Sequence, residues 1–242
     1  MAPALALRHD HALAPTEALP TRDEALARYR HLREISRRHN SEMMELLSTS
    51  ALLQQARRLG LAEGKTFVLD RMDDMNYVWD LAIHTAPPGR SRAIDRYARS
   101  VRLASGSDAA LVLDAMCKAR FAVIAVKDRH PVAGLIVTDL FRAAELWLMD
   151  EGLEMSLAPG AAIATRYFAP DRFVMAAGVV MPFDLDLLGD VVAAVPQVTR
   201  RPPVEAIDDR RLAEAMYREG IAAGLNESAS YRDAGGNEEG IL

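Results

Sequence analysis

The sequence is nearly without cysteine, since Cys117 is the one thiol among 242 residues. A single cysteine cannot form a disulfide within the chain, which excludes the disulfide-stapled folds of small secreted proteins. It fits a reducing compartment, so we expect a cytoplasmic protein. We expect Cys117 itself to be a small buried hydrophobic residue on a helix and not a reactive thiol.

Long hydrophobic runs are also missing. No run approaches the roughly 18 apolar residues that cross a membrane, and we expect no membrane partner. Residues 1–20 alternate alanine and leucine, but charged residues and Pro15 break the pattern, unlike the continuous apolar centre of a signal peptide. We predict a disordered tail there, in which His9 and His11 do not form a metal site.

Several catalytic and nucleotide-binding motifs are absent. The chain has no Ser–His–Asp order, no zinc-ligand spacing and no Gly-x-Gly-x-x-Gly loop. The segment GLAEGKT comes closest to a phosphate-binding loop, but its first glycine stands at position 60 where the motif needs position 59. A predicted helix precedes it instead of a strand. The sequence therefore indicates no cofactor and favours a protein that is not an enzyme.

Neither sign of charge dominates, but the charges are segregated along the chain. Half of the residues are hydrophobic and the net charge is −5, so the composition allows a sizeable core and does not point to nucleic acid or membrane. Residues 87–130 hold nine basic and four acidic residues, whereas residues 139–190 hold nine acidic and three basic residues. We expect a basic and an acidic side of the molecule, or two blocks that face each other.

Short apolar runs recur through residues 119–183. They are rich in Val, Ile and aromatic residues and are bounded by Gly, Pro and Asp, which is typical of strands. The predicted strands are residues 121–126, 132–137, 145–149, 163–167 and 173–180. Five strands spaced about ten residues apart indicate a small antiparallel barrel or curled sheet.

Amphipathic helices are predicted on both sides of this β module. Thr21 and Glu24 predict a capping box at the start of the first helix, and Asn40 or Ser41 is expected to end that helix and cap the next. The predicted helices are residues 21–39, 41–59, 70–84, 91–103, 109–118, 184–194 and 208–225, with a proline-rich linker at 195–204.

Together these patterns predict an α+β protein. We expect a helical N-terminal part to pack on a small antiparallel β-barrel-like module that C-terminal helices close. The expected organisation is a disordered tail at 1–20, a helical region at 21–118, the β module at 119–183, C-terminal helices at 184–225 and a disordered tail at 226–242.

A series of short motifs runs through residues 75–183. It comprises Trp79-Asp80, Arg96-Tyr97, Ala119-Arg120-Phe121 with the strand FAVIAV, Thr138-Asp139-Leu140, Gly160 ahead of Arg166, and Met175 and Gly178 ahead of Met181-Pro182. The series resembles the body of largely uncharacterised bacterial proteins that carry a C-terminal SEC-C zinc motif. Because the chain has no cysteine after Cys117, that zinc site is not carried over. The resemblance implies a helical layer plus a β module and supplies no known reaction.

Carboxylates gather on the predicted helix at residues 70–84. Asp73, Asp80 and His84 lie at i, i+7 and i+11 and therefore share one face. Such a set could hold a divalent metal, or Asp80 and His84 could form a carboxylate–imidazole pair for general-base catalysis, which gives the hypothesis of a metal-dependent hydrolase. We favour a simpler interpretation, in which acids in the first turn and a histidine in the last turn complement the helix dipole.

Arginines form a stripe on the predicted helix at residues 91–103. Several guanidinium groups on one side of a helix could contact phosphates or another anion. No aromatic residues interleave with them, so base stacking is not indicated. We favour a solvated face, or ion pairs with the acidic block. The stripe consists of Arg92, Arg96 and Arg99, with Arg90 and Arg102 beside it, and Arg30, Arg33 and Arg37 of the first helix could add to it.

The β module holds two further sets of charged residues. Arg166 is the one basic residue inside the fourth predicted strand, and we interpret it as the structural partner of a carboxylate in the acidic block, with an anion contact as the alternative. Four acids near strand ends suit Mg²⁺ or glycoside hydrolysis, but we favour acidic edges that keep the strands from pairing with other chains. These acids are Asp139, Asp150, Glu151 and Glu154.

The leading hypothesis for function is a non-enzymatic interaction or regulatory protein whose partner is another protein. It follows from the missing catalytic motifs and from the segregated charge. The first alternative is a nucleic-acid-binding protein that uses the arginine stripe, and the second is the metal-dependent hydrolase.

Overall fold

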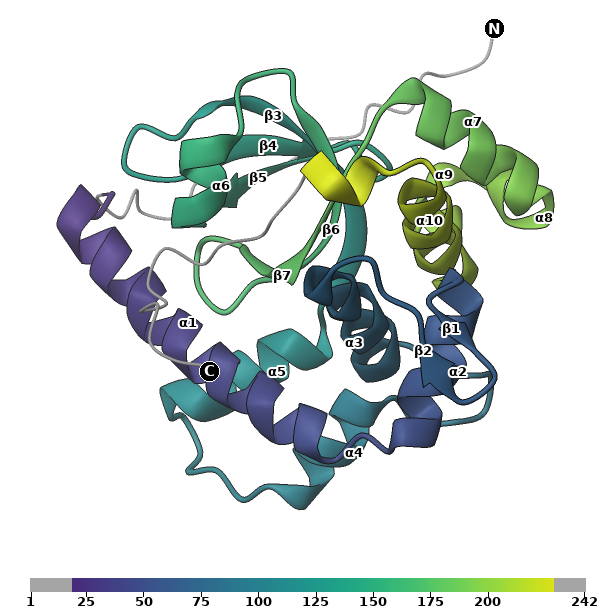
Figure 1. Ribbon diagram of the computed structural model, residues 1–242. Coiled ribbons are helices and arrows are strands. Elements are labelled where there is room, and N and C mark those ends of the chain that lie inside the picture. Colours follow the sequence, from purple (N-terminus) through teal and green to yellow (C-terminus); the bar gives the residue numbers. More distant parts are fainter. Residues whose placement is uncertain (1–18, 229–242) are drawn as a thin grey trace, which may run out of the picture.

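A five-stranded antiparallel sheet forms the centre of the computed structural model, which describes residues 19–228 (Figure 1). The predicted tails lie largely outside these residues. The strand order is β5-β4-β3-β6-β7. The strands are β3 (Arg120–Arg129), β4 (Leu135–Asp139), β5 (Ala144–Leu148), β6 (Ala162–Phe168) and β7 (Met175–Pro182).

The sheet confirms the α+β prediction but is not closed into a barrel, so that part of the prediction is wrong. Closure would need a full ladder between the edge strands β5 and β7. The two edges are joined only by one parallel bridge, between Leu148 and Val174. The carbonyl of Ala176 on β7 instead accepts a hydrogen bond from Arg33 at 2.6 Å.

Strand β7 bulges where it passes Arg166. Thr165 of β6 pairs with Val180 and Tyr167 pairs with Ala176, so three residues of β7 stand opposite one residue of β6. Gly178 within the bulge has a φ of 100°, a conformation that an L side chain disfavours. A bulge bends its strand and leaves backbone groups outside the ladder.

Helices surround the sheet close to where the sequence predicts them. The Thr21–Glu24 capping box is present, and Asp184 caps its helix as expected. The main helices are α1 (Arg22–Glu45), α2 (Thr49–Leu59), α3 (Met75–His84), α4 (Ala93–Ser100), α5 (Asp108–Cys117), α6 (Glu151–Ser156), α7 (Leu185–Ala194) and α10 (Arg210–Ala222).

Several boundaries differ from the predictions. Helix α1 does not end at Asn40 but continues to Glu45, and Ser48 caps α2. The predicted proline-rich linker contains two short helices, α8 (Pro196–Thr199) and α9 (Pro203–Ala206), each with a proline at its start. In the first turn of a helix the backbone N–H has no partner within the helix, so proline, which has no N–H, is well accommodated there. A hairpin of β1 (Ala62–Glu63) and β2 (Thr66–Phe67) and the short 3-10 helices η1 (Met72–Asp74) and η2 (Leu225–Ser228) were not predicted.

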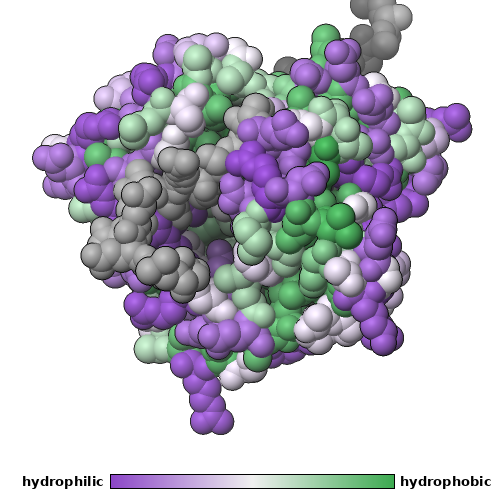
Figure 2. All heavy atoms as spheres, viewed as in Figure 1, coloured by the Kyte–Doolittle hydropathy of each residue, from purple (hydrophilic) through white to green (hydrophobic). Residues whose placement is uncertain are grey.

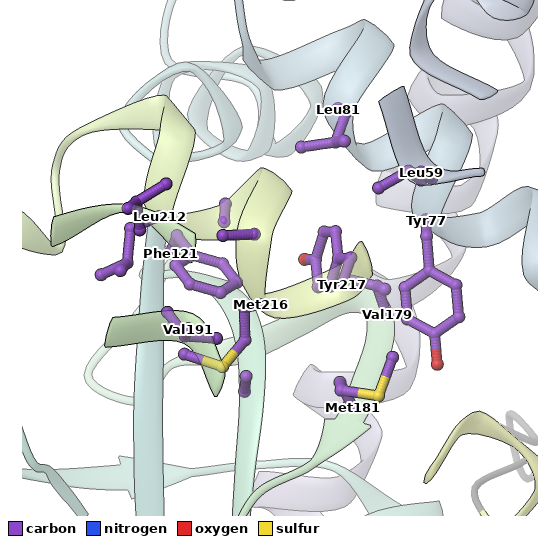
Figure 3. Close-up of a cluster of buried hydrophobic side chains, with 14 of the residues drawn as sticks. Leu59, Tyr77, Leu81, Phe121, Val179, Met181, Val191, Leu212, Met216 and Tyr217 are labelled. Atoms are coloured by element: carbon purple, nitrogen blue, oxygen red, sulfur yellow. The ribbon is translucent and has the colours of Figure 1, made fainter. Parts of the chain in front are cut away.

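Both faces of the sheet are buried. Phe121 and Val123 of β3 belong to a core shared with α2, α3 and α10, whereas Ala122 and Ile124 belong to a core on the opposite face. This double burial explains why the β3 sequence is continuously apolar and not alternating. Figure 3 shows the first core, in which Phe121 meets Tyr217 of α10 with ring centroids 5.5 Å apart at 90°.

A third core lies between the sheet and the helices α1, α4 and α5. Trp79 of α3 is half-buried and packs against both this core and the core of Figure 3. Helix α3 therefore stands at the junction of two cores, and α1 and α10 lie on opposite sides of it in Figure 1. None of the described helices combines the length and the hydrophobicity that a membrane crossing requires.

Candidate functional site

A buried ion pair joins α3 to the sheet. Arg166 of β6 donates to both carboxylate oxygens of Asp80 on α3, at 2.7 and 3.0 Å, and the hydroxyl of Tyr217 on α10 donates to Oδ2 at 3.1 Å. Burial alone would raise the pKa of Asp80, but the guanidinium of Arg166 outweighs it and holds that pKa below its ordinary value. Asp80 is therefore an ionised carboxylate whose two oxygens are bound by Arg166 and Tyr217.

The interpretation of Arg166 as a structural partner of a carboxylate agrees with this geometry, but the carboxylate is not in the acidic block. That block pairs elsewhere: Arg33 binds Asp150, Arg30 binds Glu151 and Arg22 binds Glu154.

The prediction that the four acids near strand ends are solvated and protect the sheet edges is wrong for most of them. Asp139, Asp150 and Glu154 are buried, and Asp139 binds Arg142 at 2.7 Å. The acidic block therefore largely faces arginines of α1 and of its own turns. Because Arg30 and Arg33 are used in these pairs, they add nothing to an anion-binding surface.

His84, one turn after Asp80, is buried and has an unsatisfied ring nitrogen. Its Nδ1 has no hydrogen-bond partner among the described residues. Burial, and next the positive charge of Arg166, lower the pKa of His84 to about 3. The imidazole is therefore neutral at physiological pH and is a poor general base there.

The structure does not bring the three predicted metal ligands together as a metal site. Asp73 lies in η1, is exposed and contacts Arg71 at 3.4 Å. Asp80 is occupied by Arg166 and Tyr217. No group of three or more histidine, cysteine, aspartate or glutamate side chains is placed to hold a metal within residues 19–228.

A cavity of about 450 Å³ is lined by His84 and by Arg166, the partner of Asp80. We call it the arginine pocket, because five arginines from four parts of the chain line it. Its walls are the end of α3, the start of α4, the start of β3, the middle of β6 and the turn before α10. The charged side chains that line it are Arg90, Arg92, Arg120, Arg166, Arg210, Asp95, Asp208 and Asp209.

Ion pairs leave two of these arginines available. Arg90 and Arg120 are exposed and have no carboxylate partner among the described residues. The aspartates at the pocket do not neutralise them. Asp208 pairs with Arg142 at 2.6 Å, and Asp209 pairs with Arg211 at 2.7 Å, and both of those arginines lie outside the pocket.

The predicted arginine stripe is divided by this arrangement. Arg92 lines the pocket but is held by Asp95 at 2.7 Å and by the carbonyl of Cys117 at 2.7 Å. Arg96, which donates to the carbonyl of Ser91 at 2.7 Å, does not line the pocket, and neither do Arg99 and Arg102. The last two are exposed and form no hydrogen bond or ion pair through their side chains within residues 19–228.

Sequence reasoning placed Arg90 beside the arginine stripe but missed Arg120 and Arg210 as site residues. Arg90 and Arg120 belong to the basic block at 87–130, which was the available signal. Their meeting with Arg210 depends on how β3 and α10 pack, and no local spacing encodes that packing.

A second cavity, of about 260 Å³, is lined by both Asp80 and His84. We call it the tryptophan pocket. The surface in Figure 2 is hollowed between α3 and β7, and a strip of hydrophobic residues lies beside the hollow. The residues that line this pocket are Asn40, Met44, Asn76, Trp79, Asp80, Ile83, His84, Ala177, Gly178 and Val179.

Comparison with known proteins yields one finding. The model of a family of unknown function, DUF7986, matches residues 23–219, which include every element that lines either pocket. No curated protein and no solved structure matches the chain. These findings do not test the resemblance to SEC-C-motif proteins, which stays an expectation from the sequence.

Proposed function

Since the chain belongs to DUF7986, a family whose function is not known, we propose a function from the arginine pocket. The protein binds a small anion there, such as a phosphate or carboxylate group, and acts as a non-enzymatic regulatory module. The observation that carries the proposal is the pair of arginines, Arg90 and Arg120, that lack a carboxylate partner among the described residues at a cavity with three further arginines.

Charge supports this function. Two like charges that share a pocket repel each other, and an anion between them replaces that repulsion with attraction. Guanidinium groups suit phosphate and carboxylate because their parallel N–H groups bind two oxygens at once. Arg92 and Arg166, fixed by Asp95 and Asp80, supply rigid positive walls for the same site.

The chemistry of the groups at and behind the pocket wall supports binding over catalysis. Asp80 is saturated by Arg166 and Tyr217, and His84 is neutral with a pKa of about 3. Neither is set up to take a proton from a substrate at neutral pH.

We place this activity in the cytoplasm. Cys117 supports the placement, because it is half-buried and burial raises the pKa of its thiol, as expected of a structural cysteine in a reducing compartment. A small anion that fills the pocket would then regulate how the protein meets a protein partner.

The proposal is tested by calorimetric titration of the full chain with inorganic phosphate, sulfate and acetate at low and at physiological salt. We expect saturable binding of one anion, weakened at least tenfold in Arg120→Ala and in Arg90→Ala. The matched control is Arg96→Ala, since Arg96 lies on the same basic segment but outside the pocket. Melting curves confirm that each variant is folded. No binding by the natural chain, or an equal loss in Arg96→Ala, overturns the proposal.

The same samples separate anion binding from nucleic-acid binding. A titration with single-stranded DNA and RNA addresses the exposed Arg96, Arg99 and Arg102. Nucleic-acid binding that falls steeply with salt and is lost when these three become alanine, with no phosphate binding, would replace the anion proposal by the nucleic-acid alternative.

A further inference from the structure

We infer that the tryptophan pocket is a second binding site, one that takes a neutral planar ring carrying hydrogen-bonding groups, such as a heteroaromatic amide or a nucleobase. The inference does not depend on the anion proposal, because His84 is the one residue that lines both pockets.

Polar groups without partners converge on this pocket. The side-chain amides of Asn40 and Asn76 are half-buried, and neither has a hydrogen-bond partner among the described residues. His84, which is more than nine-tenths buried, also lines the pocket with an unsatisfied Nδ1. A buried polar group without a partner is destabilising, so a ligand that forms hydrogen bonds with these groups is favoured in this pocket.

The remaining wall is apolar and offers a flat surface. Trp79 presents an indole at the junction of two cores, and Met44, Ile83 and Val179 line the pocket beside it. Indole faces pack well against other planar rings. Aromatic surface together with a few placed polar groups is the usual composition of a small-molecule site.

Electrostatics selects a neutral ligand. Asp80 is the one carboxylate that lines the tryptophan pocket, and Arg166 already neutralises it at 2.7 Å. No arginine or lysine is among the lining residues. An anion would therefore prefer the arginine pocket, and a neutral ring loses no ion pair when it enters the tryptophan pocket.

The bulge of β7 opens the pocket and contributes backbone groups. Ala177 and Gly178 lie outside the ladder between β6 and β7 and line the pocket. A Cβ atom added at Gly178 would meet nothing within 4 Å, so the space beside it is open. Bulges are frequent next to binding sites because they free backbone donors and acceptors for a ligand.

The size of the cavity limits the ligand. Its volume of about 260 Å³ equals the share of roughly nine water molecules at about 30 Å³ each. One ring with a substituent fits this space.

Trp79 provides the signal for the test. The chain has two tryptophans, and Trp147 lies away from the pocket, stacked on His130 at 4.0 Å. In the Trp147→Phe variant of the full chain the fluorescence reports Trp79 alone. This variant is titrated with nicotinamide, with adenine, with toluene as an apolar ring and with inorganic phosphate.

We expect a saturable fluorescence change with nicotinamide or adenine and none with phosphate. Replacing either amide by the similarly sized leucine, as Asn76→Leu or Asn40→Leu, should weaken binding at least tenfold. Arg120→Ala, which changes only the arginine pocket, should leave it unchanged. Toluene binding as tightly as the polar rings, or unchanged affinity in both leucine variants with intact melting curves, overturns the inference, as does no saturable change with either polar ring.

Discussion

Acid is expected to destabilise the fold through His84, well above the pH at which carboxylates titrate. Burial, with the positive charges of Arg166 and Arg92, lowers the pKa of His84 from 6.5 to about 3, although Asp80 and Asp95 oppose the shift. Below pH 6.5 the imidazole is protonated in the unfolded chain but stays neutral in the folded chain. The stability is therefore full above pH 6.5 and declines as the pH falls toward 3.

The magnitude follows from the size of the shift. Each pKa unit corresponds to about 1.4 kcal/mol of free energy of unfolding. Between pH 7 and pH 4.5 the contribution of His84 should fall by about 2–3 kcal/mol, which is a large part of the usual stability of a domain. Asp80 adds nothing in this range, because its lowered pKa confines its own effect to more acidic conditions.

The assay is guanidinium denaturation followed by circular dichroism, repeated at several pH values from about 7 down to about 4.5. The control is His84→Gln, which keeps a polar side chain but cannot titrate. All other groups titrate alike in both proteins, so the difference between their unfolding free energies isolates His84. A difference that stays constant within about 0.5 kcal/mol from pH 7 to pH 4.5 would refute the reasoning.

Two further predictions concern the stability of buried contacts. Asp80→Asn should lower the free energy of unfolding by about 3–5 kcal/mol because it leaves Arg166 buried without a carboxylate. The double variant Asp80→Leu/Arg166→Met should lose less stability than Asp80→Asn alone. Denaturation of both variants checks this order, and an equal or larger loss in the double variant would contradict it. Gly134→Ala should lower stability by roughly 2–4 kcal/mol more than Gly106→Ala in thermal melts. Both glycines have a positive φ, but only at Gly134 would the new Cβ run into the backbone carbonyl of Leu148, so equal losses would falsify this account.

The strands were predictable from the sequence because short apolar runs between turn residues determine them locally. Closure into a barrel was not, since a strand pattern does not show which edges meet. The true end of α1 was hidden for a related reason. Asn40 and Ser41 look like a helix boundary, but Met43 beyond them is buried in the core, and that packing continues the helix to Glu45.

The candidate site was predictable only in part. The i, i+4 spacing placed Asp80 and His84 on one face of a helix, and both line the tryptophan pocket. The partner that decides their chemistry, Arg166, is 86 residues away from Asp80 in the sequence. Periodicity along one helix carries no information about a strand so distant, so the hypothesis of a metal site could not be weighed against an ion pair.

The open sheet has a consequence for association between chains. An unpaired edge strand offers its backbone N–H and C=O groups to strands of other molecules. Beside β5, the carbonyl of Val174 accepts a hydrogen bond from the backbone N–H of Met149, and the N–H of Val174 donates to the carbonyl of Trp147. On β7 the carbonyl of Val180 accepts from the hydroxyl of Tyr77 at 2.8 Å, as that of Ala176 does from Arg33.

Within β5 this leaves Glu145 as the next residue whose backbone groups point outward, since such residues alternate along a strand. Its side chain is paired with Lys127 at 2.6 Å, which sets charge at the exposed end of the edge. The sheet thus gains much of the protection from edge-to-edge aggregation that a closed barrel has, by covering its edges with side chains and a neighbouring segment.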